Sequence, residues 1–144
     1  MAGAVVREPA TGGTLFANAL SLAAGRAALT EVLTEEAFAH TSALGTQLAE
    51  GLRDAIGRHG LPWSVTQAGS HAYYAFTPDP PRDGASSRAA DDPDLRALMR
   101  VFMANRGVWE SGWWLGPTVS VAHTEADVDV YVEVFSEFAS TIVG

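Results

Sequence analysis

The sequence predicts an α+β domain in which helices cover one face of a small, mainly antiparallel sheet. Two observations carry this prediction. Segments with apolar residues at helical spacing alternate with short segments typical of strands, in the order helix, helix, two strands, helix, two strands, helix. In addition, apolar residues make up 47% of the 144 residues, which is enough to form the core of one domain.

The N-terminal part divides into a loop over residues 1–17 and a first helix. The run Pro-Ala-Thr-Gly-Gly at Pro9–Gly13 is typical of a turn. We expect a helix from Asn18, a suitable N-cap, to about Leu33. Its residues are small and apolar on nearly every side, so we expect a second domain or subunit to cover it. Residues 18–144 are expected to form the domain itself.

A second helix is expected to begin after Thr34, its N-cap, and to end at Gly60 and Pro62. Large aliphatic residues recur at every fourth position of this segment and give it one apolar face. That face consists of Leu44, Leu48, Leu52 and Ile56.

Two strands are expected to follow at Trp63–Thr66 and His71–Thr77, with a turn at Gln67–Ser70 between them. Residues 78–93 then change in character, because they hold four prolines and no large apolar side chain. We therefore expect a mobile, exposed loop at about 78–93.

Asp92-Pro93 is expected to start a third helix, and Asn105–Gly107 to end it. Two further short strands are expected at Val108–Trp109 and at Thr118–Ala122. Thr124–Asp127 has the pattern of a capping box that opens a last helix. The apolar face of this last helix consists of Val128, Tyr131, Phe135, Phe138 and Ile142.

The composition excludes several classes of function. The net charge of −8 speaks against nucleic acid or an anionic membrane as the main partner. The chain has no cysteine, and its four histidines lack the spacing of metal ligands, so we expect no metal site. No apolar run is long enough to span a bilayer and the first residues do not resemble a signal peptide, so a cytoplasmic location is expected.

Lysine is absent, and all nine basic residues are arginines. The chain therefore has no lysine to act as a general base, to bind a phosphate in a Walker-type loop, or to bond a carbonyl cofactor covalently. No catalytic residue is assigned on this basis.

His123 and a group of tryptophans each have two interpretations. His123 lies just before the expected last helix, where it could bond the backbone as a structural group or act as a base. Trp109, Trp113 and Trp114 could line an apolar pocket, or they could be core or interface aromatics. We favour the structural interpretation in both cases.

Gly12-Gly13-Thr14, close before the first helix, is the local pattern with the clearest binding chemistry. Backbone amides freed by glycine, a hydroxyl group and the positive end of a helix can together bind a phosphate. Such turns are also common in proteins that bind no phosphate, so the pattern alone leaves both interpretations open.

Four segments in order resemble the class III pyridoxal-phosphate aminotransferases, in particular the glutamate-1-semialdehyde aminomutase branch. Gly12–Gly25 looks like the family's Gly-Thr-x-x-x-Asn-Pro-Leu segment, and Gly60–Thr66 resembles its first small-domain strand. Asn105–Val108 resembles its x-Arg-Gly-Val motif. Val119–Asp127 is similar to its Ser-x-Ala-His-Thr-x-x-Asp entry to the last helix.

The resemblance covers about the C-terminal third of such an enzyme. It implies the small domain of a fold-type I enzyme, preceded by a long connecting helix, with pyridoxal 5'-phosphate as the cofactor of the parent protein. The lysine-bearing large domain would precede this region. Gly13 and Thr14 match the family's cofactor-binding positions, where the threonine bonds the phosphate held by the other subunit of a dimer.

Two departures bear on the activity. The family's Asn-Pro is Asn18-Ala19 here. The aminomutases' Phe-Glu-Ala motif is replaced by Trp113–Gly116, which lacks the acid and favours an aminotransferase-like relative.

We therefore expect the C-terminal part of a class III aminotransferase, inactive alone and associating as a homo-oligomer, most simply a dimer. A missing lysine-bearing large domain is a possible further partner. Two alternatives stay open: a binding or interaction module without catalysis, and one half of a split aminotransferase.

Overall fold

The computed structural model describes residues 18–110 and 116–143. The chain divides into two compact units, residues 1–35 and 36–144. The first unit contains α1 (Ala19–Ala27) and a π-helical turn, η1 (Ala28–Val32). The Asn18 side chain accepts a hydrogen bond from the Ser21 amide at 2.9 Å, so the expected N-cap is confirmed. Large apolar side chains of this unit stay exposed, with Leu20 80% and Leu29 69% exposed.

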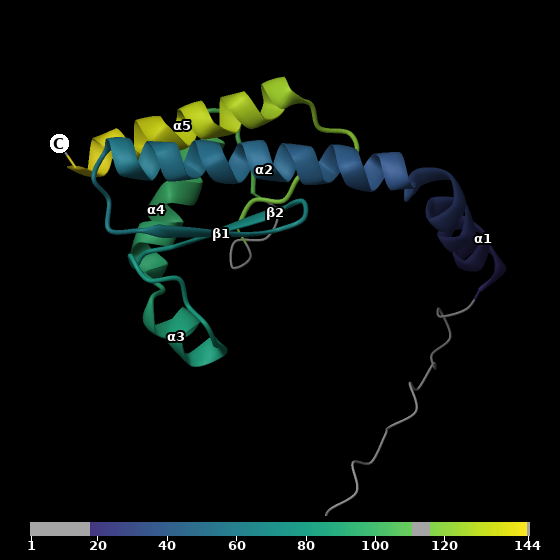
Figure 1. Ribbon diagram of the computed structural model, residues 1–144, viewed down its shortest axis with the longest axis horizontal. Coiled ribbons are helices and arrows are strands. Elements are labelled where there is room, and N and C mark those ends of the chain that lie inside the picture. The colour runs from purple at the N-terminus through teal and green to yellow at the C-terminus, as the bar shows by residue number, and fades with distance from the viewer. Residues whose placement is uncertain (1–17, 111–115, 144) are drawn as a thin grey trace, which may run out of the picture. The chain divides into compact units, whose positions relative to one another are not determined.

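The second unit is built on two long helices, α2 (Glu35–Arg58) and α5 (Glu125–Val143), which run side by side (Figure 1). A shorter helix, α4 (Pro93–Ala104), packs against α5. Strands β1 (Ser64–Ala68) and β2 (His71–Ala75) form an antiparallel hairpin, with Ser64 opposite Ala75 and Ala68 opposite His71. The expected α+β class, with an antiparallel sheet and helices, is confirmed.

The core of this unit lies where α2, α4, α5 and the hairpin meet. The predicted apolar face of α2 is confirmed, since all four of its residues are buried. From α5, Phe135 and Phe138 are fully buried, and Phe135 contacts the Tyr74 and Trp63 rings at centroid distances of 5.5 and 6.2 Å. The 3.6-residue period of both helices therefore predicted the side that the core occupies.

The predicted starts of α4 and α5 are also confirmed. Asp92 caps α4 by accepting hydrogen bonds from the Asp94 and Leu95 amides at 3.1 and 3.0 Å. At the start of α5, the Thr124 amide donates to Asp127 at 2.7 Å, and the Asp127 amide donates to the Thr124 hydroxyl at 3.3 Å. These reciprocal bonds form the expected capping box.

The second pair of strands was predicted wrongly. Val108–Trp109 forms no strand, and Thr118 makes only an isolated bridge to His71 at the edge of β2. The backbone conformation on either side of residues 117–119 explains why no longer strand forms there. Gly116 has a φ of +73° before this segment, and the His123 amide bonds back to the Ser120 carbonyl after it, so only a few residues can pair with β2. The sheet is therefore two-stranded.

The segment 78–93, expected as a loop, contains a short exposed helix, α3 (Gly84–Ala89). Asp83 and Ser86 form a capping box at its start, in which the Ser86 amide donates to Asp83 at 2.7 Å. This local pairing was not recognised among the prolines of the segment. The mobility of the segment stays a prediction.

Across residues 18–110 and 116–143, no helix combines the length and the hydropathy needed to cross a lipid bilayer.

Candidate functional site

Gly13 and Thr14, the predicted phosphate-binding residues, lie outside the described residues, as do Trp113 and Trp114. Trp109 is described and its side chain is 74% exposed, with the Arg100 guanidinium 5.5 Å from its ring centroid. It is therefore a surface aromatic rather than part of the core.

His123 has the structural role that the sequence favoured. Its Nδ1 accepts a hydrogen bond from the Ser120 amide at 2.8 Å, and the Ser120 hydroxyl lies 2.9 Å from the same atom. The His123 carbonyl oxygen lies 3.0 Å from Nε2 of His40 on α2. These contacts fix the turn that precedes α5. In the described part of the chain, no three His, Asp or Glu side chains group closely enough to hold a metal ion.

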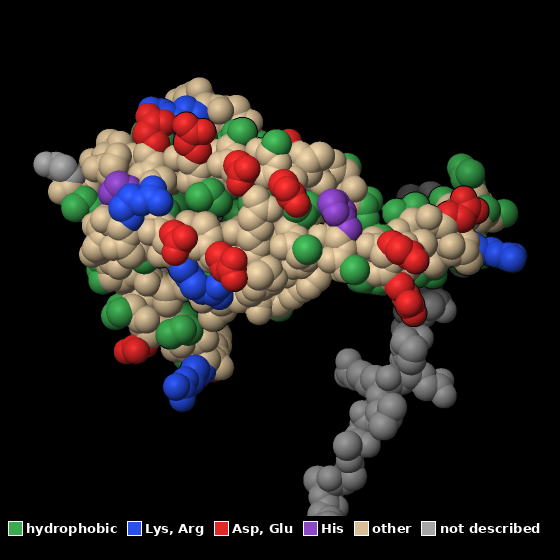
Figure 2. All heavy atoms as spheres, turned by 45° about the horizontal axis from the view of Figure 1, so that its top comes forward, with side chains coloured by type: hydrophobic (Ala, Val, Ile, Leu, Met, Phe, Trp, Pro, Cys, Tyr) green, Lys and Arg blue, Asp and Glu red, His purple; other side chains and the backbone are tan. Residues whose placement is uncertain are grey.

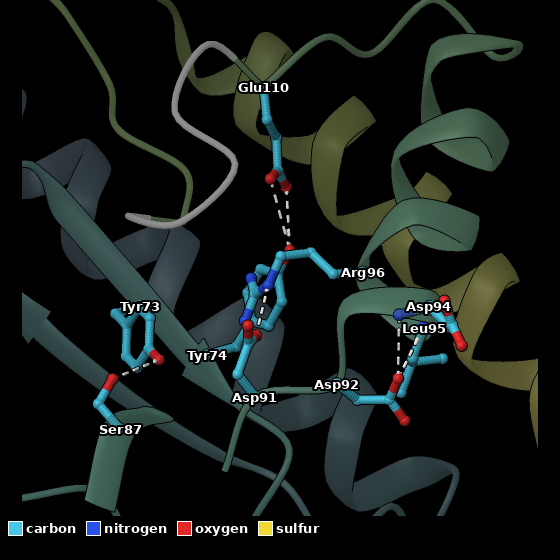
Figure 3. A network of polar contacts seen from close by, with 9 residues as sticks. All are labelled: Tyr73, Tyr74, Ser87, Asp91, Asp92, Asp94, Leu95, Arg96 and Glu110. Atoms are coloured by element: carbon cyan, nitrogen blue, oxygen red, sulfur yellow. Dashed lines mark hydrogen bonds and ion pairs between the residues drawn. The ribbon is translucent and has the colours of Figure 1, made fainter. Parts of the chain in front are cut away.

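A polar cluster, formed by the buried Tyr74 and the half-buried Glu110 and Tyr131, joins three parts of the fold. Tyr74 lies on β2 and is 1% exposed, and its hydroxyl donates toward both Glu110 oxygens at 3.4 Å each (Figure 3). Tyr131, on α5, donates a short hydrogen bond to Oε1 of Glu110. The carboxylate thus ties the chain after α4 to the hairpin and to α5.

Arg96 of α4 lies beside this cluster and is 4% exposed. Its Nε and Nη2 donate to Oδ1 of Asp91 at 2.8 and 2.7 Å, and its guanidinium lies 5.1 Å from the Phe76 ring centroid. The ion pair offsets the cost of burying the arginine charge. Figure 3 shows this pair next to the Tyr74 ring, with Glu110 approaching the Tyr74 hydroxyl from the opposite side.

Burial sets the protonation of the cluster. It raises the pKa of Tyr74 and of Tyr131 far above the usual tyrosine range, and the negative charge of Glu110 acts in the same direction. Both phenols therefore stay neutral donors. Burial also raises the pKa of Glu110, against the hydrogen bonds from the tyrosines and the charge of Arg96, which lower it.

Next to this cluster lies a pocket of about 520 Å³, here called the Glu110 pocket. Its walls come from the turn after α4, the segment 116–119 and the first turns of α5. Val108, Val119 and Val130 supply apolar lining, while Glu110 and Tyr131 supply polar atoms at the edge of the polar cluster. Asp127 and His123 also line it, and no arginine does so among the described residues.

A second hollow, of about 610 Å³, runs along the surface between α2 and α5. In Figure 2, acidic and basic side chains lie next to one another on this face. The polar groups in the hollow already bond each other, because His59 Nε2 and Arg58 Nη1 lie 3.1 and 3.3 Å from the Ser136 hydroxyl. It is a solvated groove between helices and the weaker candidate for a site.

The sequence did not identify the residues that make the Glu110 pocket. Glu110 is an isolated acid directly after the strand expected at Val108–Trp109, and Tyr131 counted only as part of an apolar face. Arg96 lies on the buried face of α4 with its ion-pair partner just before the helix. The sequence does show a charged residue, Arg96, between the apolar positions Leu95 and Met99, and this pattern could have indicated a buried arginine.

The curated relatives and the solved structures that match this chain agree in kind and in coverage. No family model matches the sequence. The glutamate-1-semialdehyde 2,1-aminomutase of Akkermansia muciniphila is 33% identical over 127 residues, which is 84% of this chain and 28% of the relative. The chain thus spans less than a third of the length of the curated relatives it matches.

Solved structures match in the same way. The glutamate-1-semialdehyde aminomutase of Pseudomonas aeruginosa PAO1 in complex with PMP has a TM-score of 0.85 and 32% identity, over 96% of this chain and 30% of that chain. A β-phenylalanine aminotransferase of Variovorax paradoxus has a TM-score of 0.78 and 29% identity, over 90% of this chain and 30% of that chain.

Proposed function

Because this chain is homologous to the C-terminal region of glutamate-1-semialdehyde 2,1-aminomutases and class III aminotransferases, we propose that it is the small C-terminal domain of a pyridoxal-phosphate-dependent aminotransferase. The observation that carries the proposal is the structural match over 96% of the chain. The proposed activity of the complete protein is transfer of an amino group from a donor to a carbonyl acceptor.

The described residues do not fit a complete cofactor site. The whole chain contains no lysine for a covalent link to the cofactor. The Glu110 pocket offers no arginine to a phosphate, and its carboxylates would repel one. We propose that a lysine-bearing large domain holds the cofactor and that this chain adds the phosphate contact of Thr14, with Gly13 beside it.

We further propose that the complete protein is a cytoplasmic dimer. Leu20, Leu22 and Leu29 of the first unit are 60–80% exposed, and each would contribute about 1.5–3 kcal/mol on burial. A large domain or a second subunit that covers them would supply this energy. The proposed contact of Thr14 with the cofactor of the other subunit also requires a second subunit.

The test is a chimera in which this chain replaces the matching C-terminal region of the Pseudomonas aeruginosa relative. Thr14→Val in this chimera should weaken pyridoxal-phosphate binding about tenfold or more, since it removes a hydrogen bond to a charged group. Thr11→Val, in the same segment, is the matched control and should leave the affinity unchanged. Equal affinities for all three proteins would contradict the proposed phosphate contact.

The chain alone provides a second check. It should show no turnover of any amino donor, and borohydride treatment with pyridoxal phosphate should leave no pyridoxyl group on an internal residue. Measured turnover by the chain alone would overturn the proposed dependence on a large domain.

A further inference from the structure

We propose that the Glu110 pocket is a binding site for a protonated amine that carries a compact apolar body. The inference concerns the second unit alone and does not depend on the proposed function. It rests on the size of the pocket, the charge of its lining and the free capacity of the Glu110 carboxylate.

The size and the lining suit a small molecule. A volume of about 520 Å³ lies within the roughly 300–1,000 Å³ typical of ligand sites. Val108, Val119 and Val130 give the pocket apolar walls, and polar side chains from Glu110, Thr118, His123, Asp127 and Tyr131 alternate with them. A ligand there would place its apolar body against the valine side chains and its charged group among the polar ones.

Glu110 provides an anchor for that charged group. A carboxylate accepts about four hydrogen bonds. Glu110 receives one short bond from Tyr131 and two long contacts of 3.4 Å from Tyr74, which leaves room for a further donor. An ammonium group has three N–H donors and no acceptor, so it can bond both this carboxylate and the oxygen of Tyr131.

The charge of the lining selects a cation over an anion. Glu110 and Asp127 are the acidic lining residues, and no arginine lines the pocket among the described residues. The nearby charge of Arg96 is already compensated by Asp91 at 2.7 Å. Arg100 stacks on the exposed ring of Trp109, and its positive charge also acts on Glu110, but its side chain does not line the pocket.

A metal ion is a poorer occupant than an amine. The described part of the chain contains no group of three or more His, Asp or Glu that could hold one. Asp127 is in addition bonded to the Thr124 amide and hydroxyl at 2.7 Å each, so its carboxylate is engaged in the capping box.

The test is a titration of the full chain, followed by the amide signals in nuclear magnetic resonance. The probes are benzylamine, which is protonated at pH 7, benzyl alcohol and benzoate. Benzylammonium should shift the amides of 107–110, 116–119 and 127–131, and should bind at least about fivefold more tightly than benzyl alcohol. Benzoate should leave these amides unmoved. Equal binding of the three probes, or shifts located elsewhere, would overturn the proposal.

Two substitutions sharpen the result. Glu110→Gln should weaken benzylammonium binding about tenfold or more, because a charged hydrogen bond is lost. Glu133→Gln is the matched control, since it makes the same change at an exposed position on α5 and should leave the affinity unchanged. If Glu110→Gln fails to fold, Trp109→Ala replaces it, because that ring is 74% exposed and its loss should weaken binding about threefold. An equal loss in the Glu133 control would contradict the assigned anchor.

Discussion

Gly45 of α2 provides a sharp test of how the hairpin packs on the long helix. In an open helical position, replacing glycine by alanine stabilises a protein by about 1 kcal/mol. At Gly45 the added methyl carbon would lie 2.2 Å from the carbonyl oxygen of Gly69 and 2.9 Å from the Ser70 Cα. Both of these atoms belong to the backbone of the β1–β2 turn.

A backbone contact this short cannot be relieved by rotating a side chain. The hairpin must move away from α2, which costs about 1–3 kcal/mol or more, as for other overpacked cores. This cost outweighs the gain in helix propensity. We therefore expect Gly45→Ala to lower the free energy of unfolding by about 1–2 kcal/mol.

The measurement is urea unfolding followed by far-ultraviolet circular dichroism. Gly57→Ala is the matched control, because it lies in the same helix and its added methyl group would meet no atom within 4 Å. This variant should gain about 1 kcal/mol. If both substitutions stabilise the protein equally, the turn does not pack against Gly45 and the reasoning is refuted.

Three further predictions concern the core, the polar cluster and a helix cap. Phe135→Ala should lower the free energy of unfolding by about 3–5 kcal/mol in urea unfolding, because the ring is fully buried; a loss below 1 kcal/mol would contradict its place in the core. Glu110 has a pKa raised above its unfolded value, so its protonation favours the folded state at low pH and this contribution is lost as the pH rises through the folded pKa. Glu110→Gln should therefore flatten the dependence of stability on pH above about pH 4.5, and an unchanged slope would refute this assignment. Thr124→Ala removes one half of the capping box and should cost about 1 kcal/mol, measured in the same way against Thr141→Ala as the control within α5.

The sequence predicted those parts of the fold that depend on local patterns. Asn18, Asp92 and Thr124 each begin a helix because a short polar side chain meets the free amides of a first turn. The apolar period of α2 and α5 predicted the core faces for the same reason, since burial follows the spacing along one helix.

The features that the sequence did not predict depend on contacts between segments far apart in the chain. Thr118 could pair with β2 over one residue only, and this limit comes from the conformation of Gly116 rather than from strand propensity. The Glu110 cluster joins residues 36 and 21 positions apart, so no local pattern marks it. The phosphate-binding prediction for Gly13 and Thr14 stays a prediction, because both lie outside the described residues.

The central claim is that this chain acts as the small domain of an aminotransferase, and the turnover of the chimera with the Pseudomonas aeruginosa large domain tests it most directly. The readout is transfer of the amino group from a donor to a carbonyl acceptor, compared with the large domain lacking any C-terminal region. The chimera should transfer amino groups, and neither part should do so alone. A chimera that folds and binds pyridoxal phosphate, yet has no more activity than the truncated large domain, would contradict the claim.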